Sequence, residues 1–286
     1  MTHPVTGIDH VLLMSGHLEE VAGQYARLGF TLSPLGQHPP AKGTANHTIM
    51  LQHDYIELLG IRQLTDLNRP RFEAVRHGGP GLHAICCRIA DAAAAAAALD
   101  RLGIGTEGLN SFDRPVPLPD GSRGRAAFTT LNFLKPDVPV GLFFMCQHRS
   151  PETVWLPDLM RHPNSALGLA ATVAISDDPL SDAGRFARCL TGGSVTRMDG
   201  GASVATGVNS ARLDLMQRSA LQRIYPAGWL DATPLNGHAV LQVRVADMDQ
   251  ARTCLDRAGI PARATPSGHI VPPDLAGGVI IEFVAE

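Results

Sequence analysis

The sequence has no cluster of basic residues, no long apolar run and few aromatic residues. Its lysines and arginines are scattered and the formal net charge of the 286 residues is −3, which argues against nucleic acid or an anionic membrane as partner. The longest largely apolar run, residues 166–175, is too short to cross a bilayer. Only 5% of the residues are aromatic, so few side chains are available to build a stacking platform for a ligand.

Cysteine usage and the first residues favour a cytoplasmic protein. The chain runs from Met1 to Pro4 directly into an apolar segment, without a basic-then-apolar targeting pattern. The cysteines are odd in number and have no Cys-X-X-Cys spacing, so reduced thiols in the cytoplasm are the simplest interpretation: Cys86, Cys87, Cys146, Cys189 and Cys254.

What the sequence does contain is an internal repeat. Four units, residues 7–60, 81–148, 168–216 and 237–284, each read as a strand, a helix and three further strands. The second and fourth units share the rhythm Cys-Arg-Ile-Ala-Asp against Val-Arg-Val-Ala-Asp, with the aspartate expected to cap the helix. Each helix is expected to end at glycine.

Such a βαβββ unit cannot bury its sheet face alone, so the units should pair. The sequence therefore predicts an α+β protein in which four βαβββ modules pair into two barrels with helices outside. We expect a first domain at residues 1–150, a connector at 151–165 and a second domain at 166–286. Locally, we expect a strand at residues 30–32 and a polar loop at residues 110–124, where Arg123 and Arg125 either bind an anionic substrate or are simply solvated.

Two ionisable residues fall inside apolar strands of the first unit. His10 lies in the expected strand at residues 7–14, and Glu57 lies in the expected strand at residues 55–59. A buried histidine and a buried carboxylate are costly unless they are paired or bound to a metal. Either a metal site or a core histidine hydrogen-bonded to a glutamate satisfies that requirement.

Several segments resemble the vicinal oxygen chelate superfamily of glyoxalase I, extradiol dioxygenases and bleomycin-resistance proteins, and more narrowly its glyoxalase-like domain subfamily. The resemblance lies in residues 7–11 (Gly-Ile-Asp-His-Val), 55–58 (Tyr-Ile-Glu-Leu), 28–31, 43–47 and 143–148, followed by Pro151, Glu152 and Trp155. It implies a divalent metal (Zn, Mn, Fe or Ni) in the cup of a paired barrel, held by residues of the first and fourth strands. The substrate would bind that metal through two adjacent oxygens.

Carried over position by position, the resemblance makes His10 and Glu57 metal ligands. The third ligand would be His148 or His83. His83 is one residue out of phase with His10, which in a strand means the opposite face unless a bulge intervenes. Gln147 would orient the substrate or a bound water.

The second pair of units has lost this pattern. The positions in phase with the ligands are Ala170, Asp214, Val240 and Glu282, which keep two carboxylates and no histidine. We expect a degenerate second domain. That departure also counts against an extradiol dioxygenase, whose iron lies in the second domain.

The sequence thus favours a metal-dependent enzyme, an isomerase, lyase or hydrolase, that acts on a small oxygenated metabolite. The alternative is a metal-free protein that binds a drug or metabolite, as in the bleomycin-resistance branch, and a third is a structural protein whose cup is filled with side chains. Small-molecule substrate and a second copy of the chain, as a homodimer, are the expected partners.

Overall fold

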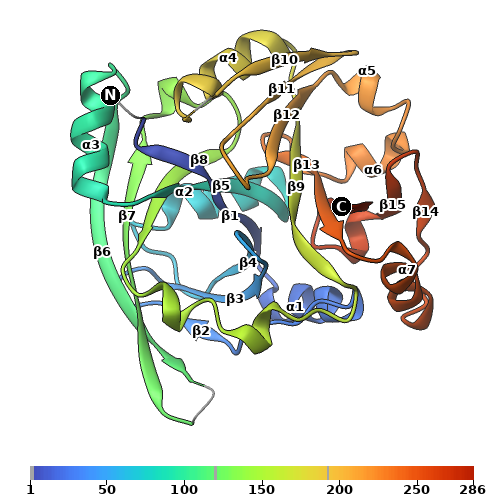
Figure 1. Ribbon diagram of the computed structural model, residues 1–286, viewed down its shortest axis with the longest axis horizontal. Coiled ribbons are helices and arrows are strands. Elements are labelled where there is room, and N and C mark those ends of the chain that lie inside the picture. Colours follow the sequence, from blue (N-terminus) through green and yellow to red (C-terminus); the bar gives the residue numbers. More distant parts are fainter. Residues whose placement is uncertain (1–2, 119–120, 192) are drawn as a thin grey trace.

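The computed structural model describes residues 3–118, 121–191 and 193–286. Its strands and helices follow four modules in chain order (Figure 1). The first module comprises β1 (Val5–Ser15), α1 (Leu18–Arg27), β2 (Gly36–Gln37), β3 (Thr44–Met50) and β4 (Tyr55–Ile61). After α2 (Arg69–Gly78), the second comprises β5 (Gly81–Ile89), α3 (Ala92–Arg101), β6 (Thr106–Pro117), β7 (Arg123–Phe133) and β8 (Leu142–His148).

The second half of the chain repeats this order. The third module comprises β9 (Ala166–Ile175), α4 (Pro179–Arg188), β10 (Val195–Met198), β11 (Gly201–Val204) and β12 (Arg212–Met216). Two short helices follow, α5 (Arg218–Leu221) and α6 (Ala227–Asp231). The fourth module comprises β13 (His238–Val245), α7 (Met248–Arg257), β14 (Arg263–Ala264), β15 (Gly268–Val271) and β16 (Ile280–Ala285).

The modules pair through their first strands. β1 runs antiparallel to β5, and β9 runs antiparallel to β13, so the first module pairs with the second and the third with the fourth. Within each module the first strand is parallel to the last: β4, β8, β12 or β16. Within the described ranges, one bridge between strands, His238 to Leu82, joins the two halves into one sheet that does not close. This confirms the predicted α+β class of paired βαβββ modules.

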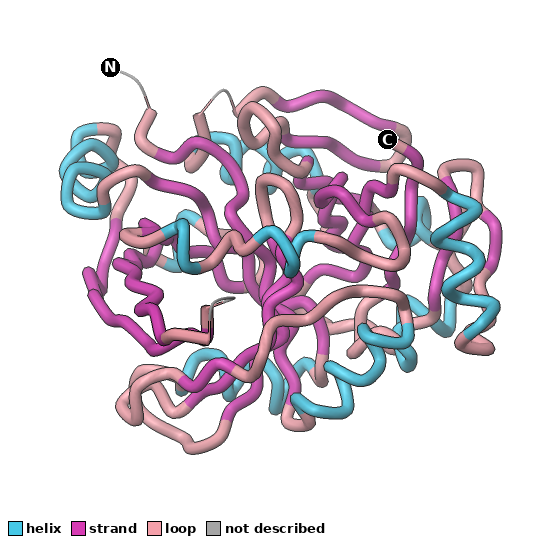
Figure 2. Tube along the Cα trace, turned by 60° about the horizontal axis from the view of Figure 1, so that its bottom comes forward, coloured by secondary structure: helices cyan, strands magenta, loops and turns pink. Residues whose placement is uncertain are grey.

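Most helices lie at the margin of the strands (Figure 2). Three of them begin at a capping aspartate, and the sequence predicts this for α3 and α7. The side chains of Asp91, Asp178 and Asp247 each accept a hydrogen bond from a backbone N–H in the first turn of α3, α4 and α7. The repeated aspartate is therefore a helix cap. Among the described residues, no helix combines the length and apolarity that a membrane span requires.

The core has one shared part and two separate cups. The largest cluster of buried apolar side chains contains residues of all four modules, including Tyr25, Leu99, Phe186 and Phe283. A second cluster lines the inside of the first pair of modules, and a third lines the inside of the second pair. The halves also touch directly, because the Asp54 carboxylate accepts a hydrogen bond from the N–H of Leu169. The domain limits at residues 150 and 166 stay a prediction.

Two local expectations were wrong. Residues 30–32 form no strand, and the second strand of the first module is instead the two-residue β2. Most of the expected loop at residues 110–124 belongs to the long hairpin β6–β7, which runs along one side of the first half (Figure 1). There Arg125 forms an ion pair with Asp113 across the hairpin.

Candidate functional site

A bulge in β1 brings two neighbouring side chains together. Ile8 pairs with Cys87 and His10 pairs with Cys86, so Asp9 is an extra residue in β1 with no partner in β5. In a regular strand Asp9 and His10 would point to opposite faces, whereas a bulge redirects one of them. Both side chains are buried, with 1% of Asp9 and 3% of His10 exposed.

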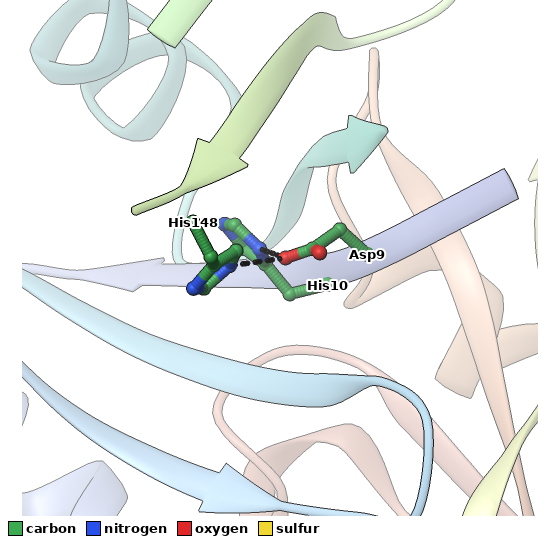
Figure 3. A group of neighbouring side chains, drawn as sticks. All are labelled: Asp9, His10 and His148. Atoms are coloured by element: carbon green, nitrogen blue, oxygen red, sulfur yellow. Dashed lines mark hydrogen bonds and ion pairs between the residues drawn. The ribbon is translucent and has the colours of Figure 1, made fainter. Parts of the chain in front are cut away.

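The Asp9 carboxylate joins two imidazoles (Figure 3). Its Oδ1 atom lies 2.6 Å from Nδ1 of His10 and 3.0 Å from Nε2 of His148, which comes from the end of β8. An ionised carboxylate only accepts hydrogen bonds, so both nitrogens donate their protons to it. The other nitrogen of His148, Nδ1, is buried and has no hydrogen-bond partner among the described residues.

On its other side, His10 faces Glu57. β4 pairs with β1 and places Glu57 opposite Leu12, two residues beyond His10 on the same face. Nε2 of His10 and Oε2 of Glu57 are 3.5 Å apart. Asn46 donates a hydrogen bond of 2.7 Å to the other carboxylate oxygen, Oε1. The ring of Tyr55 stacks on His10 with 4.2 Å between centroids, which fixes the plane of the imidazole.

The surroundings favour the ionised form of both carboxylates. Burial alone raises the pKa of Asp9, but the charge of His148 and the hydrogen bonds from both imidazoles lower it well below its usual range. Burial also opposes ionisation of Glu57, yet the charges of His10 and His38 and the hydrogen bond from Asn46 lower the pKa of that carboxyl below its ordinary value.

His10 and Glu57 line a cavity of about 380 Å³ in the cup of the first module pair. That volume is in the range of small-molecule sites. Part of the wall is apolar and is formed by Leu12, Leu59, Phe112, Phe128 and Phe144. Asp9 and His148 are not among its lining residues, so they lie behind His10 as seen from the cavity.

The structure separates the remaining residues that the sequence singled out. The side chain of Gln147 accepts a hydrogen bond from the N–H of Ala92 at the start of α3, outside the cavity. His83 contacts the carbonyl oxygen of Gly79 through Nε2, at 2.7 Å, and also lies outside the cavity wall. Of the two candidates for a third ligand, only His148 is therefore close to His10.

In the second half, both carboxylates have side-chain partners, and Asp214 forms an ion pair with Arg212 at 3.6 Å. Asp214 accepts a hydrogen bond from Ser203. Glu282 is fully buried and accepts hydrogen bonds from four side chains: Tyr225, Gln242, Thr265 and Ser267. Across the described residues, one group of three side chains has possible metal-ligand atoms that all lie within 4.8 Å of one another. It consists of Asp9, His10 and His148, in the first half.

Sequence reasoning missed Asp9 and two cavity residues, Arg71 and Arg114. Strict strand alternation puts the side chains of Asp9 and His10 on opposite faces of the strand. The one hint that β1 is irregular is Gly7, whose φ is 145°. Arg71 lies in α2, which buries none of its side chains and so has no apolar periodicity to reveal it. Arg114 lies in the stretch that was expected to be a loop.

Comparisons with known proteins agree with this architecture. The family model of the glyoxalase-like domain matches residues 8–190. No curated protein matches the chain. At 13% identity and a TM-score of 0.68, a hypothetical protein from Staphylococcus aureus has a similar fold over 98% of this chain and 99% of its own.

Two enzymes of known structure share the fold at the same identity. Homoprotocatechuate 2,3-dioxygenase from Arthrobacter globiformis is similar at 13% identity over 100% of this chain and 81% of its own, with a TM-score of 0.57. A mutant of 4-hydroxymandelate synthase from Streptomyces coelicolor is similar at 13% identity over 99% and 93%, with a TM-score of 0.54. The family match covers more than half of the residues, so the chain belongs to the glyoxalase-like domain family, and it shares its fold with these two enzymes.

Proposed function

We propose that this protein is a divalent-metal-dependent enzyme that acts on a small oxygenated metabolite, and that His10 and Glu57 hold the metal at the cavity wall. The observation that carries the proposal is the contact between Nε2 of His10 and Oε2 of Glu57, with Asp9 behind the imidazole. Because Nδ1 gives its proton to Asp9, Nε2 presents to the carboxylate either a lone pair or a second proton.

The distance between the two atoms supports a shared metal. At 3.5 Å the contact is longer than an N–H···O hydrogen bond, which is typically about 2.7–3.2 Å. Two ligand atoms on one tetrahedral ion, each about 2.1 Å from it, are about 3.4 Å apart. Imidazole and carboxylate suit Zn, Mn, Fe(II) or Ni, so the donor set fits a divalent ion without selecting one.

Each neighbouring residue has a part in this account. Asp9 fixes the tautomer of His10 that aims a lone pair at the cavity, the arrangement that supports metal-binding histidines in general. Asn46 holds one oxygen of Glu57 and leaves the other directed at His10. Tyr55 and Phe144 pack against the imidazole and exclude water from it. When bound, the metal would act as a Lewis acid that polarises a substrate oxygen.

Proton transfer would then fall to the residues around the metal. A carboxylate beside a polarised substrate can accept a proton from carbon or from water, and Glu57 lies at the cavity wall, where it could fill that role. Isomerisation, elimination and hydrolysis all need such a step. We assign no part in it to Gln147 or His83.

The position of the metal can be tested with single variants of the full chain. Glu57→Gln and His10→Ala should both reduce bound metal from about one equivalent to a small fraction. His83→Gln is the matched control, because the glutamine amide can still donate to the carbonyl of Gly79, and it should keep the metal. If His148→Gln abolishes binding while Glu57→Gln does not, the metal belongs instead between Asp9, His10 and His148.

A metal-free binding protein is the second candidate. It is favoured by the closed hydrogen bonding of Asp9, which already satisfies one nitrogen of each imidazole without a metal. In that case, ligand binding should be unaffected by chelators, and Glu57→Gln should leave the metal content at background.

A further inference from the structure

The cavity wall carries three cationic side chains from three different elements. Lys42 lies in the turn before β3, Arg71 lies in α2 and Arg114 lies in β6, and all three line the same cavity as His10. They are close enough to act on one site. Burial lowers the pKa of His38 to about 4, and although Glu57 opposes this shift, all three cations add to it.

These cations have no acidic partner among the residues that the structure describes. Within the part of the chain that the structure describes, no carboxylate oxygen lies within 4.0 Å of a side-chain nitrogen of Lys42, Arg71 or Arg114. Lys42 instead lies over the ring of Phe112, with Nζ 3.2 Å from its centroid, and Arg71 lies over Phe144 at 5.3 Å. By contrast, exposed arginines such as Arg252 do form ion pairs, here with Asp256.

Arg114 is the clearest case of an unmet charge. This residue is only 7% exposed, and its buried Nε atom has no hydrogen-bond partner among the described residues. A buried guanidinium that lacks both a counter-charge and hydrogen bonds is costly. The charge of Glu57 acts on Arg114, but this carboxylate already accepts a hydrogen bond from Asn46 and contacts His10.

Another part of the wall is apolar, and uncharged polar side chains such as Thr48 and Asn132 line the remainder. The apolar side chains include Phe112, Phe128, Phe144, Leu12 and Leu59. A ligand that satisfies both parts of this wall needs an anionic group and an apolar body. Planar guanidinium groups bind the oxygens of carboxylate and phosphate groups through paired hydrogen bonds.

We propose that the cavity binds a small organic anion, with a carboxylate or phosphate group held by Arg71, Arg114 and Lys42 and an apolar body packed on the phenylalanines. The inference rests on the proposed function in that the same ligand would reach His10 and Glu57 with its adjacent oxygens. It names the substrate class of that site, which the metal ligands alone do not select.

Three probes of similar shape test the charge requirement: phenylacetate, phenyl phosphate and phenylacetamide. Their binding to the purified full chain would be measured by isothermal titration calorimetry, before and after chelation of metal. At least one anion should bind about tenfold or more tightly than the amide. The stronger anion identifies carboxylate or phosphate as the preferred group.

Arg71→Gln and Arg114→Gln should each remove most of this preference, and Arg71→Lys should retain part of it because the charge remains. Arg252→Gln, an exposed arginine on α7, is the matched control and should bind as the wild type does. Circular dichroism checks the fold of each variant. Arg71 is less deeply buried than Arg114, so Arg71→Gln still tests the proposal if Arg114→Gln does not fold.

Equal binding of the amide and both anions would overturn the proposal. So would an anion preference that survives in both glutamine variants, or the failure of all three probes to bind natively folded protein at millimolar concentration. Anion preference that persists after chelation supports this inference even where the metal content is at background, so the two proposals fail separately.

Discussion

Replacing Asp9 by asparagine should weaken both the fold and the metal site. Asp9 is 1% exposed, and its carboxylate accepts two hydrogen bonds, from His10 at 2.6 Å and from His148 at 3.0 Å. An asparagine of the same shape converts two charge-assisted bonds into neutral ones, each about 1 kcal/mol weaker. The free energy of unfolding should therefore fall by about 2 kcal/mol. Because His10 also loses its fixed tautomer, metal affinity should fall about 10- to 100-fold.

Urea unfolding followed by circular dichroism measures the first effect, and metal titration of the folded variant measures the second. Asp91→Asn is a suitable control, since asparagine caps helices as well as aspartate does and the residue lies away from the cavity. An Asp9→Asn protein with wild-type stability and wild-type metal affinity would refute the reasoning. Loss of stability with unchanged affinity would make Asp9 a purely structural residue.

Three further predictions follow from other buried groups. Burial raises the pKa of Asp54 to about 7, so the folded protein holds this carboxyl protonated more strongly than the unfolded chain does. The free energy of unfolding should therefore fall as the pH rises from about 4 to about 7, by up to about 4 kcal/mol. Asp54→Asn should flatten that decline in urea unfolding, and an unchanged pH profile would contradict it. Glu282→Gln should lower the free energy of unfolding by about 1–3 kcal/mol, because four donors lose an anionic acceptor, yet leave bound metal unchanged. Asn46→Ala should lower metal affinity about tenfold by releasing Glu57, and equal affinity would remove Asn46 from the site.

The repeated pattern of strands and helices was sufficient to predict the modules and how they pair. An apolar first strand, a capping aspartate and a glycine after the helix recur in the sequence. Each favours its element locally, and tertiary packing favours the same structure. The resemblance implied His10 and Glu57 at the site, and the regular register of β1 and β4 from His10 onward brings both to the cavity wall. The expected strand at residues 30–32 failed because a short apolar run alone does not specify pairing.

The details of the site could not be predicted for a different reason. Asp9 reaches His10 and His148 through a bulge, and periodicity assumes that no bulge exists. Arg71 and Arg114 come from a helix with no buried face and from a partly exposed hairpin, where the sequence carries no pattern to orient them. Gln147 was expected at the cavity, but the open N-terminal turn of α3 offers it an N–H donor.

The central claim is tested most directly by elemental analysis of the protein purified without chelator, alongside His10→Ala. The account predicts about one equivalent of a transition metal in the native protein and loss of that metal in the variant, with the fold retained by circular dichroism. A native protein with no metal above background that also takes up no Zn, Mn, Fe(II) or Ni when they are added would contradict it. His10 and Glu57 would then be a buried polar pair in a metal-free binding site.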